Sequence, residues 1–166
     1  AGVSHVYIGV ESTSQSTLDL YQKDIKVNES KKAIDLINSH GMISETSFVL
    51  GTPEETAASI RKTVELAKWY APDMAFFLAI APWPYADLYP QLEPHVAVRD
   101  YRKYNLIDPI IRPHAMTTAE VENAIIDCYR SFYMDKARAL ASAPPSAHRD
   151  YMLRSIKIIM GSSFVQ

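Results

Sequence analysis

A strand pattern gives way to a helix start within residues 42–56, which read MISETSFVLGTPEET. Met42 to Leu50 is a predicted strand, because β-branched and aromatic residues are frequent in it. The segment from Thr52 to Glu55 is a predicted helix start: threonine can cap, proline suits the first helical position, and glutamate three residues later completes a capping box. A strand that leads directly into a helix is typical of α/β proteins.

The same alternation continues on both sides of this stretch. His5 to Glu11 alternates between apolar and other side chains and is a predicted strand. A short helix near residues 18–21 follows, and then a longer helix with Asn28 as its expected N-cap and Gly41 as its left-handed C-terminal residue. Met74 to Ala81 is almost continuously apolar, as in a strand buried on both faces. The order predicts a parallel sheet with right-handed crossovers.

The remainder of the chain has a different pattern. Residues 82–113 are rich in proline and tyrosine and show little periodicity. A long helix is predicted from Thr117 to about Ala141, and a last helix from about Ser146. We expect these two C-terminal helices to be an appended unit that covers the sheet.

The composition restricts the classes of partner and chemistry. The chain has 166 residues, 48% of them hydrophobic and 22% charged, which suits one globular domain. A net charge of -2 gives no electrostatic case for nucleic acid or an anionic membrane. The single cysteine, Cys128, excludes an internal disulfide and a cysteine-ligated metal cluster built from this chain alone. We therefore expect a cytoplasmic chain without a transmembrane segment or a metal site of its own.

Three predicted strand ends carry residues that could contact a ligand, and parallel α/β folds bind ligands at such ends. Glu11 would place a carboxylate at the rim, where it could accept hydrogen bonds from a ligand; an ordinary surface carboxylate is the alternative. Gly51 would let a ligand approach the backbone, and a helix beginning at Thr52 would offer free N–H groups, although a glycine before a capped helix is common. Residues 83–85 (Trp-Pro-Tyr) would stack on a flat ligand or cover the core.

These strand ends resemble the radical-SAM barrel. Residues 9–15 (GVESTSQ) are similar to the GVESGSQ segment that ends the fourth strand in many such enzymes. Residues 47–56 (SFVLGTPEET) resemble the fifth-strand pattern GxIxGxPGET, and residues 81–89 (APWPYADLY) the sixth-strand pattern TPxPGTxLY. Residues 76–85 and 100–105 resemble, more narrowly, cobalamin-binding members of the anaerobic magnesium-protoporphyrin IX monomethyl ester oxidative cyclase type.

The resemblance implies the cofactors of a full-length protein. They are a [4Fe–4S] cluster held by a Cys-x3-Cys-x2-Cys loop, S-adenosylmethionine, which the cluster cleaves to a 5′-deoxyadenosyl radical, and cobalamin. The implied reaction inserts a water-derived oxygen and closes the fifth ring of a bacteriochlorophyll precursor. The implied cofactor-binding residues are, by position, Glu11, Ser12, Ser47, Val49, Gly51, Pro82 and Trp83. The first two would lie near the ribose and methionine, the next three on the adenine side, and the last two against cofactor or substrate.

The resemblance also sets the expected organisation. Residues 1–90 would be the C-terminal half of the barrel, residues 91–116 an irregular connection rich in proline and tyrosine, and residues 117–166 a helical extension. The fold class is thus α/β, a partial TIM-like barrel of about three parallel strands with crossover helices. The cluster loop and the cobalamin domain are absent from this sequence, so we expect a fragment that binds none of these cofactors by itself and is inert without the missing N-terminal half.

Departures from the family pattern leave alternatives open. Thr13, Ser47 and Glu54 stand where the family has glycine, and the charge of Glu54 weakens an anion site at the following helix. A cobalamin-dependent radical-SAM methyltransferase would share the same strand ends. A non-catalytic α/β interaction domain and a phosphate-binding barrel fragment are the other readings. Three strands cannot close a barrel, so we expect the isolated chain to self-associate. A flat tetrapyrrole is the expected small-molecule substrate.

Overall fold

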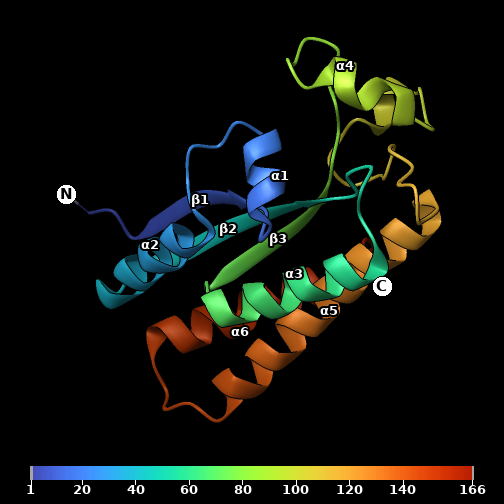
Figure 1. The fold of residues 1–166 in the computed structure, drawn as a ribbon. Helices are drawn as coiled ribbons and strands as arrows, with labels where there is room; N and C mark the ends of the chain where they lie inside the picture. The colour runs from blue at the N-terminus through green and yellow to red at the C-terminus, as the bar shows by residue number, and fades with distance from the viewer. Residues whose placement is uncertain (1, 166) are drawn as a thin grey trace.

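The computed structural model describes residues 2–165 and has an α/β fold built on a three-stranded parallel sheet (Figure 1). The strands are β1 (His5–Glu11), β2 (Ile43–Leu50) and β3 (Met74–Ala79), in the spatial order β1-β2-β3. The predicted parallel sheet and its strand positions are therefore confirmed. β3 ends two residues earlier than expected, although the Ile80 N–H still donates to the Leu50 carbonyl at 2.8 Å.

Helices α1 (Gln15–Leu20) and α2 (Val27–Ser39) connect β1 to β2. The prediction of Asn28 as the N-cap is wrong, because α2 begins at Val27. Lys26 is the N-cap instead, and its N–H donates a hydrogen bond to the Glu29 carboxylate at 2.7 Å. Gly41 has a φ of 68°, which confirms the left-handed residue after this helix.

Helix α3 (Ala57–Tyr70) begins later than the sequence predicts. Its N-cap is Thr56, whose hydroxyl accepts from the Ser59 N–H at 3.1 Å, whereas Thr52 precedes a turn closed by the Glu55 N–H. Thr52 and Thr56 are each followed three positions later by a polar residue, so either could be the N-cap. Pro53 favours Thr52 in a reading of the sequence, whereas the structure uses Thr56. The predicted helix start at Thr52, with its free N–H groups, is therefore wrong.

The segment between β3 and α5 is made of short helical turns and loops at the carboxyl end of the sheet. It contains α4 (Tyr89–Leu92), two 3-10 turns (Glu93–His95 and Tyr101–Lys103) and an isolated antiparallel bridge between Val96 and Ile111. In Figure 1 this segment projects from the end of β3, away from the C-terminal helices.

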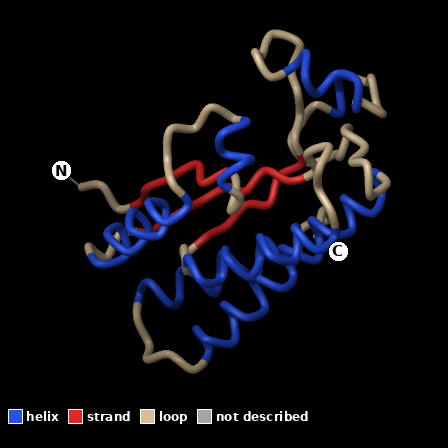
Figure 2. The backbone as a smooth tube through the Cα atoms, in the orientation of Figure 1, coloured by secondary structure: helices blue, strands red, loops and turns tan. Residues whose placement is uncertain are grey.

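Helices α5 (Thr118–Ala141) and α6 (Ala147–Met160) complete the chain. Thr117 caps α5 together with Glu120, as predicted. Figure 2 shows α3, α5 and α6 along one side of the sheet, and α5 contacts both α3 and β3. The main core lies between them; Phe48, Phe77 and Phe132 are at most 3% exposed. No helix in residues 2–165 has the length and apolarity needed to cross a bilayer.

The two faces of the sheet differ. The helix-covered face carries the fully buried Phe48 and Phe77, which are paired in register and stack at 5.5 Å between ring centroids. The opposite face, which we call the open face, carries the alternate residues of the strands. Phe76 and Leu78 are only partly buried there, whereas Ser47 and Met74 are buried. The prediction that the third strand is buried on both faces is therefore wrong at Phe76 and Leu78.

Candidate functional site

The carboxyl ends of the strands border two neighbouring cavities. The first, which we call the rim cavity, has a volume of about 410 Å³ and is lined from β1, β2, the turn after α1 and the segment after β3. The second, the loop cavity of about 490 Å³, lies between the loop at residues 11–17 and the start of α3. Glu11 and Val49 line both, so the predicted convergence of strand ends is present in the structure.

Glu11 is the centre of this region. Its carboxylate accepts from the Lys23 ammonium at 3.1 Å and from the Ser47 hydroxyl at 3.4 Å. Lys23 also donates to the Gly9 carbonyl at 3.1 Å. The Glu11 side chain is 22% exposed, so the carboxylate is held in place at the rim rather than free in solvent. A ligand hydroxyl or amine can therefore add to a preformed acceptor.

Gly9 allows this arrangement. A Cβ at position 9 would overlap the Glu11 carboxylate and would also come within 3.1 Å of the Lys23 ammonium. The β1–β2 register shifts between Gly9 and Glu11, which is the signature of a β-bulge. A glycine inside a strand often marks such a close approach, and here the approaching group is the Glu11 carboxylate.

Backbone strain is concentrated around the rim cavity. Glu11, Gln22 and Leu106 have φ values of 61°, 54° and 65°, in the left-handed region that non-glycine residues avoid. All three line the rim cavity. Among the described residues the other such non-glycine position is Ala71, which ends α3. Strain of this kind persists where the surrounding structure enforces it, typically at ligand sites.

Tyr21 lines the rim cavity, but its hydroxyl group is buried away from solvent. The Tyr21 phenol oxygen is closed to solvent and forms no hydrogen bond in the described chain. Burial is the main cause that raises its pKa, and the charges of Glu55 and Glu11 add to the effect. On the opposite wall the Trp83 ring stacks on Tyr85, with 6.4 Å between centroids and 9° between planes.

The other predicted site residues are distributed around these cavities. Ser12 lines the loop cavity, Ser47 contacts Glu11, and Trp83 lines the rim cavity. Gly51 and Pro82 are buried at the strand ends and line neither cavity. Gly51 has a φ of 88°, and a Cβ there would meet a Val121 methyl group at 3.2 Å, so the protein itself fills the space beside it.

The loop cavity does not offer an anion site at a helix start. The Glu55 carboxylate accepts from the Gly51 N–H at 3.3 Å and from the Ser59 hydroxyl. Burial raises the pKa of the Glu55 carboxyl, opposed by the hydrogen bonds from Ser59 and Gly51. Because a carboxylate already occupies this position and α3 begins at Ala57, the phosphate-binding reading of the Thr52 segment is wrong.

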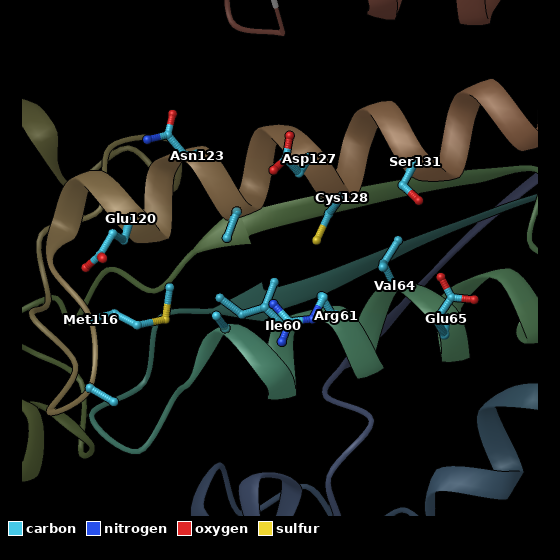
Figure 3. Close-up of a pocket in the computed structure, with 13 residues that line it drawn as sticks. Ile60, Arg61, Val64, Glu65, Met116, Glu120, Asn123, Asp127, Cys128 and Ser131 are labelled. Atoms are coloured by element: carbon cyan, nitrogen blue, oxygen red, sulfur yellow. The ribbon is translucent and has the colours of Figure 1, made fainter.

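A third cavity, of about 570 Å³, lies between α3 and α5 and contains none of the predicted site residues (Figure 3). The Cys128 side chain points into this space between the helices, but the residue is only 2% exposed. Burial raises the pKa of its thiol to about 12, so it stays protonated and serves as a core residue. Within residues 2–165, no group of three or more histidine, cysteine or acidic side chains is placed to hold a metal ion.

Sequence reasoning missed Tyr21, Gln22 and Lys23. All three belong to the turn after α1, where an aromatic, an amide and a cationic residue carry no distinctive pattern. Gly9 was the available signal, because a glycine within an alternating strand indicates that another group approaches its backbone.

The chain is thus a parallel α/β protein with a cavity at the carboxyl ends of its strands. A solved structure of Elp3 from the archaeon Methanocaldococcus infernus has this fold: it matches 95% of this chain and 37% of its own, with a TM-score of 0.55 at 14% identity. No family model matches the sequence.

Sequence relatives are more specific. The chain is 34% identical to the anaerobic magnesium-protoporphyrin IX monomethyl ester cyclase of Rubrivivax gelatinosus. The match covers 99% of this chain and 30% of that protein. It is 36% identical, over 82% of its length, to 22% of the cyclase of the same name from Cereibacter sphaeroides. An uncharacterised methyltransferase of Pyrococcus horikoshii is 30% identical over 80% of this chain and 29% of its own.

The predicted resemblance is therefore confirmed: this chain is a homologue of one part of the anaerobic magnesium-protoporphyrin IX monomethyl ester cyclases. It spans less than a third of the length of the curated relatives it matches.

Proposed function

We propose that this chain forms the S-adenosylmethionine-facing wall of a radical-SAM enzyme, and that the complete protein is an oxidative cyclase that closes the fifth ring of magnesium-protoporphyrin IX monomethyl ester. The observation that carries the proposal is the rim cavity. Glu11 lines this cavity in a left-handed backbone conformation and accepts a hydrogen bond at 3.4 Å from the buried Ser47, and both residues match the family's strand-end motifs by position.

The chemistry of the residues fits a nucleoside-bearing cofactor. Glu11 supplies an acceptor for hydroxyl groups, Val49 an apolar wall, and Trp83 an aromatic surface. Ser12, Ser47, Gly51 and Pro82 shape the surrounding strand ends. S-adenosylmethionine is the source of the 5′-deoxyadenosyl radical in the enzymes that the sequence resembles. The residues of this chain bind and orient the cofactor, and the half-barrel they form requires further strands for closure.

The residues of this chain do not fit the [4Fe–4S] cluster. The cluster needs several cysteine thiolates, whereas Cys128 is the only cysteine of the sequence and is buried between helices as a thiol. Other parts of the complete protein would therefore hold the cluster and cobalamin. The 166-residue chain alone would be inert.

The test uses the protein expressed from its complete reading frame and purified without oxygen. Wild-type protein should bind S-adenosylmethionine in a calorimetric titration, and Glu11→Gln should weaken the binding about tenfold, since a hydrogen bond to a charged acceptor is lost. Glu45→Gln is the matched control, because Glu45 pairs with His5 at 2.6 Å at the other end of the strands. Unchanged binding by Glu11→Gln would contradict the placement of the cofactor.

The product decides between two reaction classes. The cyclase proposal requires that magnesium-protoporphyrin IX monomethyl ester gain a fifth ring and an oxygen atom, which mass spectrometry detects. A methyltransferase is the second candidate, supported by the similarity to the Pyrococcus horikoshii protein. It would add a methyl group to its substrate without closing a ring, and that result would replace the cyclase assignment.

A further inference from the structure

The loop cavity is a second, polar space that the proposed function does not use. It lies between residues 11–17, which connect β1 to α1, and the start of α3, and has a volume of about 490 Å³. Eight of its lining residues carry a hydroxyl group, and three of these, Ser12, Thr52 and Thr63, are at most 8% exposed. A water molecule takes up about 30 Å³ of liquid, so the cavity has room for a small organic molecule and not only for an ion.

Thr52 presents a hydroxyl group without a partner to this cavity. The residue is 6% exposed and lines the loop cavity. Its backbone carbonyl accepts from the Glu55 N–H at 2.9 Å, whereas its hydroxyl has no partner among the described residues. Thr63 is equally buried, but its hydroxyl pairs with that of Thr13 at 3.2 Å. Unlike the Tyr21 oxygen, the Thr52 oxygen is not closed to solvent, so a molecule in the cavity can reach it.

The charges around the loop cavity favour a cation. Three carboxylates, those of Glu11, Glu54 and Glu55, line it against a single lysine, Lys62. Lys62 is exposed, so its long stem can keep the ammonium group in water. Glu11 is paired with Lys23 at 3.1 Å, and the Glu54 side chain is 86% exposed. Glu55 is therefore the carboxylate that a ligand in the cavity would contact.

Glu55 is held in place without a positive partner. It is half-buried, and its carboxylate accepts from the Gly51 N–H at 3.3 Å and from the Ser59 hydroxyl. Burial raises the pKa of its carboxyl, and no cation within residues 2–165 opposes that rise. A half-buried carboxylate with two donors fixed on it is a preformed acceptor, and a cationic donor would offset the cost of its burial.

The lining residues select among cations. They include no aromatic ring that could surround a quaternary ammonium group, and the described residues contain no donor set placed for a metal ion. A primary ammonium group has three N–H donors, which suit carboxylate and hydroxyl oxygens. We propose that the loop cavity is a binding site for a small organic molecule with a primary ammonium group, which donates to the Glu55 carboxylate and the Thr52 hydroxyl. This site is separate from the cofactor site in the rim cavity.

The test titrates three probes into the protein expressed from its complete reading frame, with and without S-adenosylmethionine. The probes are 1,4-diaminobutane, the neutral 1,4-butanediol of the same chain length, and potassium chloride. Calorimetry should show that 1,4-diaminobutane binds at least about tenfold more tightly than 1,4-butanediol, as expected for hydrogen bonds to a charged acceptor. The affinity should be the same in the presence of S-adenosylmethionine.

Two variants and one control assign the binding to this cavity. Glu55→Gln should weaken 1,4-diaminobutane binding about tenfold or more, and Thr52→Val about fivefold. Thr52→Val should leave the midpoint of denaturant unfolding unchanged, because the hydroxyl has no protein partner. Glu65→Gln is the matched control: it removes a carboxylate that is 68% exposed on α3, outside the loop cavity, and should keep the wild-type affinity.

The outcomes separate this site from the proposed function. Binding of 1,4-diaminobutane by a protein that does not bind S-adenosylmethionine would reject the cofactor proposal and retain the ammonium site. Equal binding of 1,4-diaminobutane and 1,4-butanediol, competition by potassium chloride at equal concentration, or wild-type affinity in both variants would overturn the ammonium site. Loss of 1,4-diaminobutane binding when S-adenosylmethionine is bound would show that the two cavities are one site, which would also overturn the inference.

Discussion

At the scale of single residues, the site is distinguished by backbone strain more than by any reactive side chain. Glu11, Gln22 and Leu106 come from three separate segments, yet their left-handed backbones meet at one cavity. Each such residue costs the fold about 1 kcal/mol. Glycine adopts this backbone conformation without that cost, yet all three positions carry side chains. This pattern is expected where a side chain or a fixed turn serves binding.

Gln22 allows a direct measurement of this strain. Its side chain is exposed, so Gln22→Gly removes the left-handed penalty with little loss of contacts. We expect the free energy of unfolding to rise by about 0.5 kcal/mol, because the gain is offset in part by the greater freedom of glycine in the unfolded chain. Lys32→Gly, at an exposed position within α2, should instead lower it by about 1 kcal/mol. Equal losses from both substitutions would show that Gln22 is not strained.

Glu55 predicts a pH dependence. Burial raises the pKa of its carboxyl in the folded state, so the charged form destabilises the fold above that pKa. As the pH falls through the raised pKa toward the ordinary value, the folded state takes up a proton first and this destabilisation disappears. Glu55→Gln removes the charge and keeps an oxygen acceptor for only one of the two donors, Gly51 or Ser59, a loss that does not change with pH. Denaturant unfolding should be measured from about pH 4, near the ordinary carboxyl pKa, to about pH 8. The free energy of unfolding of the variant, relative to that of the wild type, should increase with pH. An advantage that shrinks with pH would contradict the raised pKa.

At the scale of elements, local patterns predicted the strands and helices well and their boundaries less well. The alternation in β1 and the cap of α5 at Thr117 are short-range features, and the structure confirms both. The start of α3 depends on a local competition, in which the Glu55 carboxylate accepts a hydrogen bond from the Gly51 N–H and Thr56 becomes the N-cap. The cavity-lining residues of the turn after α1 could not be predicted for a different reason, because only the tertiary fold places them beside β1 and β2.

The start of α3 is testable with two threonines. Thr56→Ala should lower the free energy of unfolding by about 1 kcal/mol, because the Ser59 N–H loses its acceptor at the helix N-terminus. Thr52→Ala should have a smaller effect, since Thr52 precedes the turn and caps no helix. Thermal or denaturant unfolding measures both. The reverse order would restore the helix start that the sequence alone suggests.

At the scale of the whole molecule, the open face of the sheet is the feature that bears on the proposed half-barrel. On this face Ser47 pairs in register with Phe76, and Val49 pairs with Leu78. The apolar side chains of Val49, Phe76 and Leu78 are only partly buried, whereas Ser47 is buried. The proposed half-barrel would account for this asymmetry, because the open face would then be the interior of the closed barrel.

The proposed half-barrel predicts that one double substitution destabilises the isolated chain only mildly and the complete protein strongly. In the 166-residue chain, Phe76→Thr with Leu78→Thr should reduce self-association in analytical ultracentrifugation and lower the free energy of unfolding by less than about 2 kcal/mol, because both side chains are partly exposed there. Phe77→Thr, on the covered face of the same strand, should cost about 3 kcal/mol or more. In the protein expressed from its complete reading frame, the double substitution should become as costly as the core substitution, since the remaining strands would bury both positions. If the double substitution is equally mild in both contexts, then the open face is not a barrel interior, and the chain is an independent α/β domain.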